Sequence, residues 1–274
     1  MAACALAWLW YGSQQMPPPA NDRTGARRER LAQALATPER KARHVRQLFE
    51  QIAGRYDAIT VGLSYGRDRH WKDTLTRMAC VQPGERALDL ACGTGDIAVR
   101  LAQAGATVTG LDVTTSMLRL ARVRNRDIAG VHWVQGDMMA LPLPTAAYDI
   151  VTVGYGLRNV PDLDTALREI RRVLRPGGRV LSLDFTLPAS PVLRHAYLAY
   201  LDVVGGLVGR ALHGDPDTYR YIPASLRRYA GAAGVAERMR ALGFVDVAWW
   251  PLLGGLMAIN TGYSVKWPCS IPLK

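Results

Sequence analysis

The segment ALDLACGTGD, residues 87–96, joins an apolar run to two closely spaced glycines and an acidic residue. The apolar run is typical of a buried strand, and Gly93 and Gly95 predict a tight turn from that strand into a helix. In an open parallel sheet, ligands bind at the carboxyl ends of the strands, where a close backbone approach requires glycine. The segment therefore predicts a nucleotide-type cofactor site, and with Ala98 it also matches the GxGxxG/A outline of a dinucleotide site.

Short apolar runs alternate with helical segments from residue 86 onward, which indicates a parallel sheet covered on both faces. We expect strands at 86–91, 106–112, 131–137, 148–156 and 177–185, with helices at 97–104, 116–124 and 164–174. After Asp184 this alternation of strands and helices ends. We expect residues 187–229 to form helices lying over the sheet, followed by a helix at 232–244 and two antiparallel strands within 245–267.

Acidic residues at the ends of the expected strands discriminate between cofactors. Asp89, at the end of the first strand, would repel a pyrophosphate but suits a cationic ligand. Asp112 ends the second strand, where a carboxylate accepts both hydroxyls of a ribose, and Asp137 ends the third, where it would receive an adenine amino group. A pyrophosphate needs a bare helix N-terminus, whereas Asp96 stands there, either as a helix N-cap or as a ligand contact. The acidic loop favours S-adenosylmethionine (SAM) over a dinucleotide.

Composition sets limits on partners. The chain has 274 residues and a net charge of +11, which favours an anionic partner or an anionic membrane surface. No motif combines aromatic and basic residues, so we expect no nucleic-acid partner. The cysteines are scattered, without a CxxC pair or a His-rich neighbour, which predicts reduced thiols of a cytoplasmic protein and no metal site.

The N-terminal region, residues 1–36, is expected to be a disordered extension, apolar at first and then basic and rich in proline. Its apolar stretch is too short to span a bilayer, and it is either a weak membrane anchor or a segment upstream of a true start at Met16. A helix is expected to begin at Thr37, with an apolar stripe from Val45 to Ile52. The main domain is predicted at 37–267 and a tail at 268–274.

Five segments together carry a family resemblance: DLACGTGD, GLD, QGDMMALP, GYGLRNV and RVLRPGGRVLSLDF. With them the chain resembles class I SAM-dependent methyltransferases. Residues 56–72, YDAITVGLSYGRDRHWK, narrow the similarity to the ubiquinone/menaquinone biosynthesis C-methyltransferase family, whose pattern is matched by Tyr56, Asp57, Ser64, Gly66, Trp71 and Lys72. The resemblance covers roughly residues 47–267. It implies an α/β fold: a Rossmann-like sheet of seven strands with the last antiparallel, and a helical lid inserted after the fifth strand at about 187–230.

The resemblance also implies the cofactor contacts. SAM would be bound by Thr94, Asp112, Asp137, Met138 and Gly154, in addition to Asp89, Gly93 and Gly95. The chain departs from the family pattern at several positions: Thr60 replaces an Asn, Asp68 a common His, Asp184 a Glu and Thr186 a Ser, and Gly154 stands where some members have a Ser that touches the cofactor. These departures leave the quinone head group open.

The family reaction is methylation of a ring carbon beside a phenolic hydroxyl on a polyprenylated quinol, and the resemblance assigns the catalysis to Arg158, Asn159 and Tyr56. Because guanidinium does not deprotonate in proteins, we interpret Arg158 as a fixed cation that stabilises the phenolate, with a structural salt bridge as the alternative. Asn159 orients the hydroxyl or serves as a turn residue, and Tyr56 covers the cofactor or packs in the core. His195 and His213 are either general bases or ordinary surface or core residues.

The preferred substrate is demethylmenaquinol, with the ubiquinone intermediate second. The alternatives are a SAM-dependent methyltransferase of another small molecule, a nicotinamide-dependent oxidoreductase and a catalytically inactive SAM-binding protein. A prenyl tail must leave the site toward lipid. The apolar segment 192–214 and the basic N-terminal helix therefore predict peripheral contact with the inner face of the membrane. The same segments would alternatively form a homodimer interface or part of the core.

Overall fold

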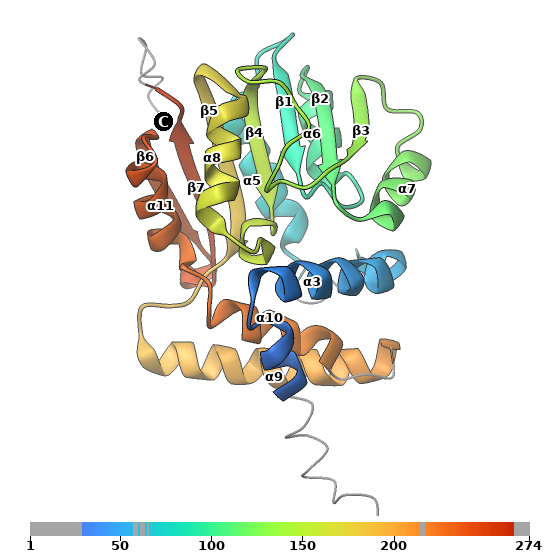
Figure 1. The fold of residues 1–274 in the computed structure, drawn as a ribbon, viewed down its shortest axis with the longest axis vertical. Coiled ribbons are helices and arrows are strands. Elements are labelled where there is room, and N and C mark those ends of the chain that lie inside the picture. Colours follow the sequence, from blue (N-terminus) through green and yellow to red (C-terminus); the bar gives the residue numbers. More distant parts are fainter. Residues whose placement is uncertain (1–28, 57–59, 61–63, 65, 214–216, 266–274) are drawn as a thin grey trace, which may run out of the picture.

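Seven strands form one sheet in the order β3-β2-β1-β4-β5-β7-β6 (Figure 1). The computed structural model describes residues 29–56, 60, 64, 66–213 and 217–265. Strands β1 to β5 are parallel, and β7 runs antiparallel to both of its neighbours. The predicted seven-stranded sheet with an antiparallel last strand is therefore confirmed. The strands are β1 Arg86–Leu90, β2 Thr107–Asp112, β3 Val131–Gln135, β4 Tyr148–Gly154, β5 Leu174–Phe185, β6 Val245–Leu252 and β7 Met257–Tyr263.

Helices cover both faces of the sheet because each buried strand is apolar on both sides. In β4, Val151 and Val153 belong to a core shared with α8 and α11, whereas Ile150 belongs to the opposite core, shared with α5 and α6. This alternation follows from the two-residue repeat of a strand. The helices are α3 Pro38–Ile52, α5 Asp68–Ala79, α6 Asp96–Gln103, α7 Thr115–Arg124, α8 Leu163–Val173, α9 Pro191–His213, α10 Asp217–Leu226 and α11 Gly231–Ala241.

Two of these helices begin with a side-chain cap, the first at the position expected from the sequence. Thr37 accepts a hydrogen bond from the Arg40 N–H at the start of α3, where Pro38 fits the first turn. Asp162 accepts from the Thr165 N–H at the start of α8. The start of α7 is capped from another helix, because the Glu50 carboxylate of α3 accepts from the first backbone N–H groups of α7. This contact fixes α3 beside the carboxyl end of β2.

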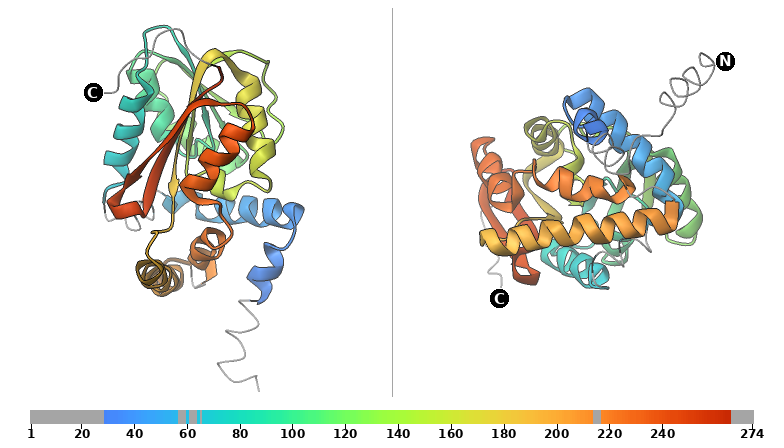
Figure 2. Two further views of the ribbon diagram at one scale, coloured as in Figure 1. Left: turned by 90° about the vertical axis from the view of Figure 1, so that its left-hand side faces the viewer. Right: turned by 90° about the horizontal axis from the view of Figure 1, so that it is seen from below.

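Helices α3, α9 and α10 lie beyond the carboxyl ends of the strands and do not cover a face of the sheet (Figures 1 and 2). The helices expected between residues 187 and 229 are present, but their predicted position over the sheet is wrong. Both faces are already covered, so the buried side of α9, with Tyr197 and Leu201, packs against Leu226 and the end of β5. The predicted apolar stripe of α3 packs against Tyr219 and Tyr221 of α10.

No helix in the described part of the chain is both long enough and apolar enough to cross a membrane. The predicted extension up to residue 28, Asp57 and the tail 268–274 lie outside the described residues, as does the side chain of His213.

Candidate active site

A cavity of about 790 Å³, part of it open to solvent, lies at the carboxyl ends of β1, β2 and β4, with α3 on its far side. This is the position that the strand and glycine pattern predicted. The structure brings seven of the predicted site residues into its wall: Tyr56, Gly93, Asp112, Asp137, Met138, Gly154 and Asn159. Four others lie outside that wall: Asp89, Thr94, Gly95 and Arg158.

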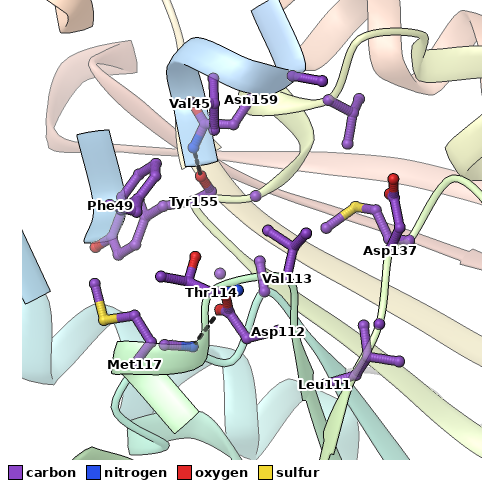
Figure 3. A pocket seen from close by; sticks show the side chains of 18 of the residues that line it. Val45, Phe49, Leu111, Asp112, Val113, Thr114, Met117, Asp137, Tyr155 and Asn159 are labelled. Carbon is purple, nitrogen blue, oxygen red and sulfur yellow. Dashed lines mark hydrogen bonds between the residues drawn. The ribbon is translucent and has the colours of Figure 1, made fainter. Parts of the chain in front are cut away.

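Asp112 is held in the wall of this cavity by two backbone hydrogen bonds. Its Oδ2 accepts a hydrogen bond of 2.9 Å from the Gly93 N–H, and its Oδ1 accepts one of 2.8 Å from the Thr114 N–H. Burial raises the pKa of this carboxyl, although both hydrogen bonds oppose the rise. Figure 3 shows Asp112 facing a space bordered by Phe49 and Asp137. Each oxygen keeps a lone pair for a ligand hydroxyl.

The two glycines of the turn, Gly93 and Gly95, have different roles. Gly93 has a φ of +54°, and the nearest atom to the place of an added Cβ is Tyr56 Cε1 at 3.8 Å, so its backbone faces open space in the cavity. Gly95 has a φ of +95°, and an added Cβ would overlap the Trp133 ring. Gly93 therefore permits approach of a ligand, whereas Gly95 and the buried Thr94 shape the turn behind it.

Asp89 and Asp96 do not reach this cavity. Asp89 is fully buried, where it accepts 2.7 Å and 3.1 Å hydrogen bonds from Thr152 Oγ1 and the Ala98 N–H. Burial raises its pKa to about 7. It fastens the start of α6 to the sheet. Asp96 is neither the N-cap nor part of the cavity wall: Gly95 occupies the cap position, and Asp96 forms a 2.8 Å ion pair with Lys72.

Asp137 and Met138 form the wall beyond β3. Asp137 is exposed, and its Oδ1 accepts a 2.8 Å hydrogen bond from the Met139 N–H. Met138 is buried in the core beneath it. Gly154 lies on the opposite side at the end of β4, where an added Cβ would lie 2.6 Å from Ile97 Cδ1, the end of a flexible side chain. A serine at this position would therefore require the Ile97 side chain to shift.

A second cavity, of about 590 Å³, adjoins the first between α3 and α10. Its wall is mainly aliphatic and aromatic, with Leu48, Ile52, Phe185, Tyr219, Tyr221 and Ile222 among its members. Three residues line both cavities: Phe49, Tyr56 and Tyr155. Arg158 lies in the wall of the second cavity.

Arg158 is buried and held at several points. Its Nε lies 3.3 Å from Asp184 Oδ1, its backbone N–H donates to Asp184 Oδ2 at 3.0 Å, and an Nη donates to Ser225 Oγ at 2.6 Å. Its guanidinium also lies 5.3 Å from the centre of the Phe185 ring. The alternative of a structural salt bridge is therefore present in the molecule, and the same arginine also faces the second cavity.

Asn159 and Tyr56 occupy the boundary between the cavities. The Asn159 amide donates to the Tyr155 carbonyl at 2.8 Å, and its oxygen accepts from the Tyr221 hydroxyl at 2.9 Å. Burial raises the pKa of the Tyr56 hydroxyl. Tyr155 has a φ of +58°, a strained conformation for a tyrosine. These residues link the chain after β4 to α10 and to the segment after α3.

Comparison with known proteins decides the family. The sequence profile of the ubiE/COQ5 methyltransferase family matches residues 37–264. This chain belongs to the ubiE/COQ5 methyltransferase family. The predictions of a SAM-dependent methyltransferase, of SAM as its cofactor and of a C-methyltransferase of menaquinone or ubiquinone biosynthesis are confirmed by this membership. Membership also decides against the nicotinamide-dependent oxidoreductase.

The ubiE/COQ5 chain is 37% identical over 228 residues to the demethylmenaquinone methyltransferase of Geobacillus kaustophilus, a match that covers 81% of this chain and 97% of that protein. It is 39% identical over 230 residues to the ubiquinone/menaquinone biosynthesis C-methyltransferase UbiE of Edwardsiella ictaluri, covering 81% and 91%. Among solved structures it is similar to a SAM-dependent methyltransferase of Thermotoga maritima, described as a possible histamine N-methyltransferase. The TM-score is 0.57 and the identity 19%, over 80% of this chain and 99% of that one. At that identity the likeness shows the fold alone.

Two residues of α3 that the sequence analysis missed fasten this helix over the site of the ubiE/COQ5 chain. Lys41 Nζ donates to the backbone carbonyls of Arg158 and Val160, at 3.1 Å and 2.5 Å. Burial and the Arg158 charge lower the pKa of Lys41 to about 8. Glu50 caps α7, as described above. No local signal distinguishes this lysine from the exposed arginines of the same helix.

Of the two histidines named as alternative bases, His195 does not line either cavity, and the side chain of His213 lies outside the described residues. His195 is exposed, and its Nδ1 lies 2.7 Å from the Pro191 carbonyl of its own helix. A histidine that the sequence analysis passed over lies nearer: the His44 ring of α3 is 5.6 Å from that of Tyr221, and burial lowers its pKa.

Proposed function

We propose that the domain predicted at residues 37–267 transfers a methyl group from SAM to a ring carbon of a polyprenylated quinol, with demethylmenaquinol preferred over the ubiquinone intermediate. The observation that carries this proposal is the pair of adjoining cavities. One carries the carboxylates of Asp112 and Asp137, and the other is mainly apolar and holds a buried cation. Phe49, Tyr56 and Tyr155 border both. Such a pair suits a polar cofactor and a flat apolar acceptor that must meet.

The residues of the first cavity fit SAM. The Asp112 carboxylate, already fixed by two backbone N–H groups, would accept the ribose hydroxyls. The open backbone at Gly93 would allow close approach, and Asp137 would receive the adenine amino group beside Met138. When bound, SAM supplies a methyl group activated by its sulfonium charge. The chain contributes position, since transfer needs the acceptor carbon in line with that methyl group.

The second cavity would hold the quinol ring among its aromatic walls. Arg158 stays protonated, so it stabilises the negative charge that develops on the quinol oxygen. Asp184 offsets part of the arginine's charge, and together with Ser225 it fixes the guanidinium in place. The action of Arg158 is therefore local hydrogen-bond donation from a preset position. Asn159 would orient the hydroxyl with the amide hydrogen that its bond to the Tyr155 carbonyl leaves over.

The test is product analysis by mass spectrometry. Purified full-length protein is given SAM with chemically reduced demethylmenaquinol, and in parallel with the benzoquinol analogue. We expect a mass gain of one methylene on demethylmenaquinol, with a loss of turnover of about 100-fold or more in Arg158→Ala, the size of effect that removal of a preset donor produces. Absence of product on both quinols, despite binding of S-adenosylhomocysteine, would refute the quinol proposal and favour another small acceptor.

We further propose that α9 contacts the cytoplasmic face of an anionic bilayer. Four of its apolar side chains point outward with exposed fractions of 59% to 77%: Val192, Leu193, Val203 and Leu207. α9 crosses the underside of the molecule (Figure 2, right), and its neighbour α10 supplies part of the second cavity wall. Exposed apolar area joined to a net charge of +11 is the combination that binds anionic bilayers.

Sedimentation with lipid vesicles tests this contact. We expect binding to vesicles that contain phosphatidylglycerol, no binding to phosphatidylcholine alone, and loss of binding in the Val203→Glu, Leu207→Glu double variant. If that variant instead changes the molar mass in light scattering while wild-type protein ignores vesicles, α9 is a homodimer interface and the membrane contact is wrong.

A further inference from the structure

A chain of short polar contacts leads away from the boundary of the two cavities. The Tyr155 hydroxyl donates to Asp68 Oδ1 at 2.6 Å, and Asp68 Oδ2 lies 2.6 Å from Lys72 Nζ. The same ammonium lies 2.8 Å from Asp96 Oδ2. The side chains of Asp68 and Lys72 are 6% and 8% exposed, whereas that of Asp96 is 48% exposed. The contacts therefore join a buried carboxylate to the cavities on one side and to the surface on the other.

The inner end of this chain belongs to the cavity wall. Tyr155 lines both cavities, and Ser64, which lines the second, accepts a 3.1 Å hydrogen bond at its Oγ from the Asp68 N–H. Tyr56, which also lines both cavities, interacts electrostatically with Asp68 and Lys72. Asp68 consequently stands directly behind the part of the wall that a quinol hydroxyl would face.

Methylation of a ring carbon leaves one proton to be removed. The quinol O–H bond breaks, and the ring carbon uses its electron pair to bond the methyl group while the S–CH₃ bond breaks with its pair kept by sulfur. The hydrogen on the methylated carbon then leaves as a proton, and through water it restores the hydroxyl as the ring regains aromaticity. The net change replaces one ring hydrogen by methyl and sets free the first proton, which needs an acceptor.

The two charged groups at the arginine of the second cavity, Arg158 and Asp184, do not serve as that acceptor. Arg158 is already a cation. The Asp184 carboxylate receives Arg158 Nε and two backbone N–H groups, from Arg158 and Phe185. His195 is directed at its own helix. Asp68, by contrast, is reached through a hydroxyl that lines the cavities, and Lys72 holds its second oxygen.

We infer that the quinol proton passes to the Tyr155 oxygen while the Tyr155 proton passes to Asp68, which makes Tyr155 the substrate-facing residue and Asp68 the acceptor that acts through it. This inference rests on the proposed quinol methylation. Lys72 pairs with the second oxygen of Asp68, and Asp96 pairs with Lys72 from the solvent side. Because burial and the Asp68 charge raise the pKa of Tyr155 well above its usual range, the tyrosine gives up its own proton as it takes the new one.

The test combines two conservative variants and their double. Asp68→Asn keeps the size and shape of the side chain but replaces one acceptor oxygen by an NH₂ group and removes the charge, and Tyr155→Phe removes only the hydroxyl. We expect each to lower kcat by about 100-fold, the usual contribution of general acid–base catalysis, with KM for SAM unchanged. We expect the double variant to lose no more than either single variant, since both break one path. Added formate should restore part of the turnover of Asp68→Ala.

Calorimetric titration with S-adenosylhomocysteine does not depend on turnover and should match wild type in Asp68→Asn, while thermal unfolding shows whether the variant is folded after loss of its buried pair with Lys72. Asp73→Asn is the matched control, since Asp73 lies on the same helix in a surface ion pair with Arg100. Wild-type turnover in either single variant, or losses that add in the double, would overturn the inference while leaving the quinol reaction in place. Absence of quinol product from wild-type protein would overturn both the proposed quinol methylation and this inference.

Discussion

Replacing Asp112 by asparagine isolates what its charge does for the cofactor. The variant keeps the size of the side chain but exchanges one acceptor oxygen for an NH₂ group. In the wild-type structure both oxygens already accept a backbone N–H, from Gly93 and Thr114. In the variant, one of these N–H groups must therefore face the NH₂ group of the asparagine. The ribose of SAM would also lose a charged acceptor.

The magnitude follows from these contacts. A hydrogen bond to a charged group contributes about 1.5–3 kcal/mol, and about 1.4 kcal/mol corresponds to a tenfold change in affinity. We therefore expect SAM and S-adenosylhomocysteine to bind about 10- to 150-fold more weakly to Asp112→Asn. The unpaired N–H costs about 1–3 kcal/mol of stability. Burial of the charged carboxylate is unfavourable, which is why the pKa of Asp112 is raised. The neutral asparagine avoids this cost, and that offsets part of the loss of stability.

Isothermal titration with S-adenosylhomocysteine measures the affinity, and thermal unfolding shows whether the variant is folded. Asp149→Asn is the control, because Asp149 pairs with Arg175 and accepts from the Arg86 N–H at the opposite end of the strands. A folded Asp112→Asn protein that binds within about twofold of wild type would refute the assignment of this carboxylate to the ribose. Equal weakening in Asp149→Asn would show that the loss is not local.

Three further predictions concern burial and backbone strain. Because the pKa of Asp89 is raised to about 7, the folded state binds more protons than the unfolded state between about pH 4 and pH 7, so the free energy of unfolding falls as pH rises across that window. In urea unfolding at a series of pH values, the free energy of unfolding of Asp89→Asn should depend less on pH than that of wild type. An unchanged pH dependence would contradict the raised pKa of Asp89. The pKa of Lys41 is lowered to about 8, so the unfolded state binds more protons from there to its ordinary value of 10.5, and stability should rise with pH over that range. Lys41→Met should abolish this rise and weaken S-adenosylhomocysteine binding, which calorimetry would detect. Gly95→Ala should cost about 1–3 kcal/mol or more in thermal unfolding, since a positive φ and the Trp133 ring both oppose a side chain. Gly84→Ala, with a φ of +85° and nothing near its Cβ, should lose less, and equal losses would show that the ring yields.

Much of the fold and part of the site follow from local sequence. Strand repeats place Asp112 and Asp137 at the ends of adjacent parallel strands, so their arrival in one cavity is a consequence of topology. Gly93 is predictable for the same reason. The roles of these residues toward SAM stay predictions that the binding experiments address.

What the sequence did not reveal depends on contacts between distant segments. The sequence shows Asp96 at a helix start, but its partner Lys72 lies 24 residues away. Lys41 meets the Arg158 carbonyl across 117 residues. Helix α9 lies beyond the strand ends because other helices of the chain already cover both faces of the sheet. The apolar pattern of the α9 sequence by itself does not reveal this.

Tyr155 shows how the two cavities depend on one strained residue. Its backbone N–H donates to the Leu183 carbonyl at 2.7 Å, its own carbonyl accepts from Asn159, and its hydroxyl donates to Asp68. A positive φ at a tyrosine costs about 1–3 kcal/mol, and these three hydrogen bonds are large enough together to hold it there. With the usual backbone conformation, the carbonyl and the ring would point elsewhere, and neither contact would form. The strain is therefore what lets one residue line both the first and the second cavity and touch the buried carboxylate at once.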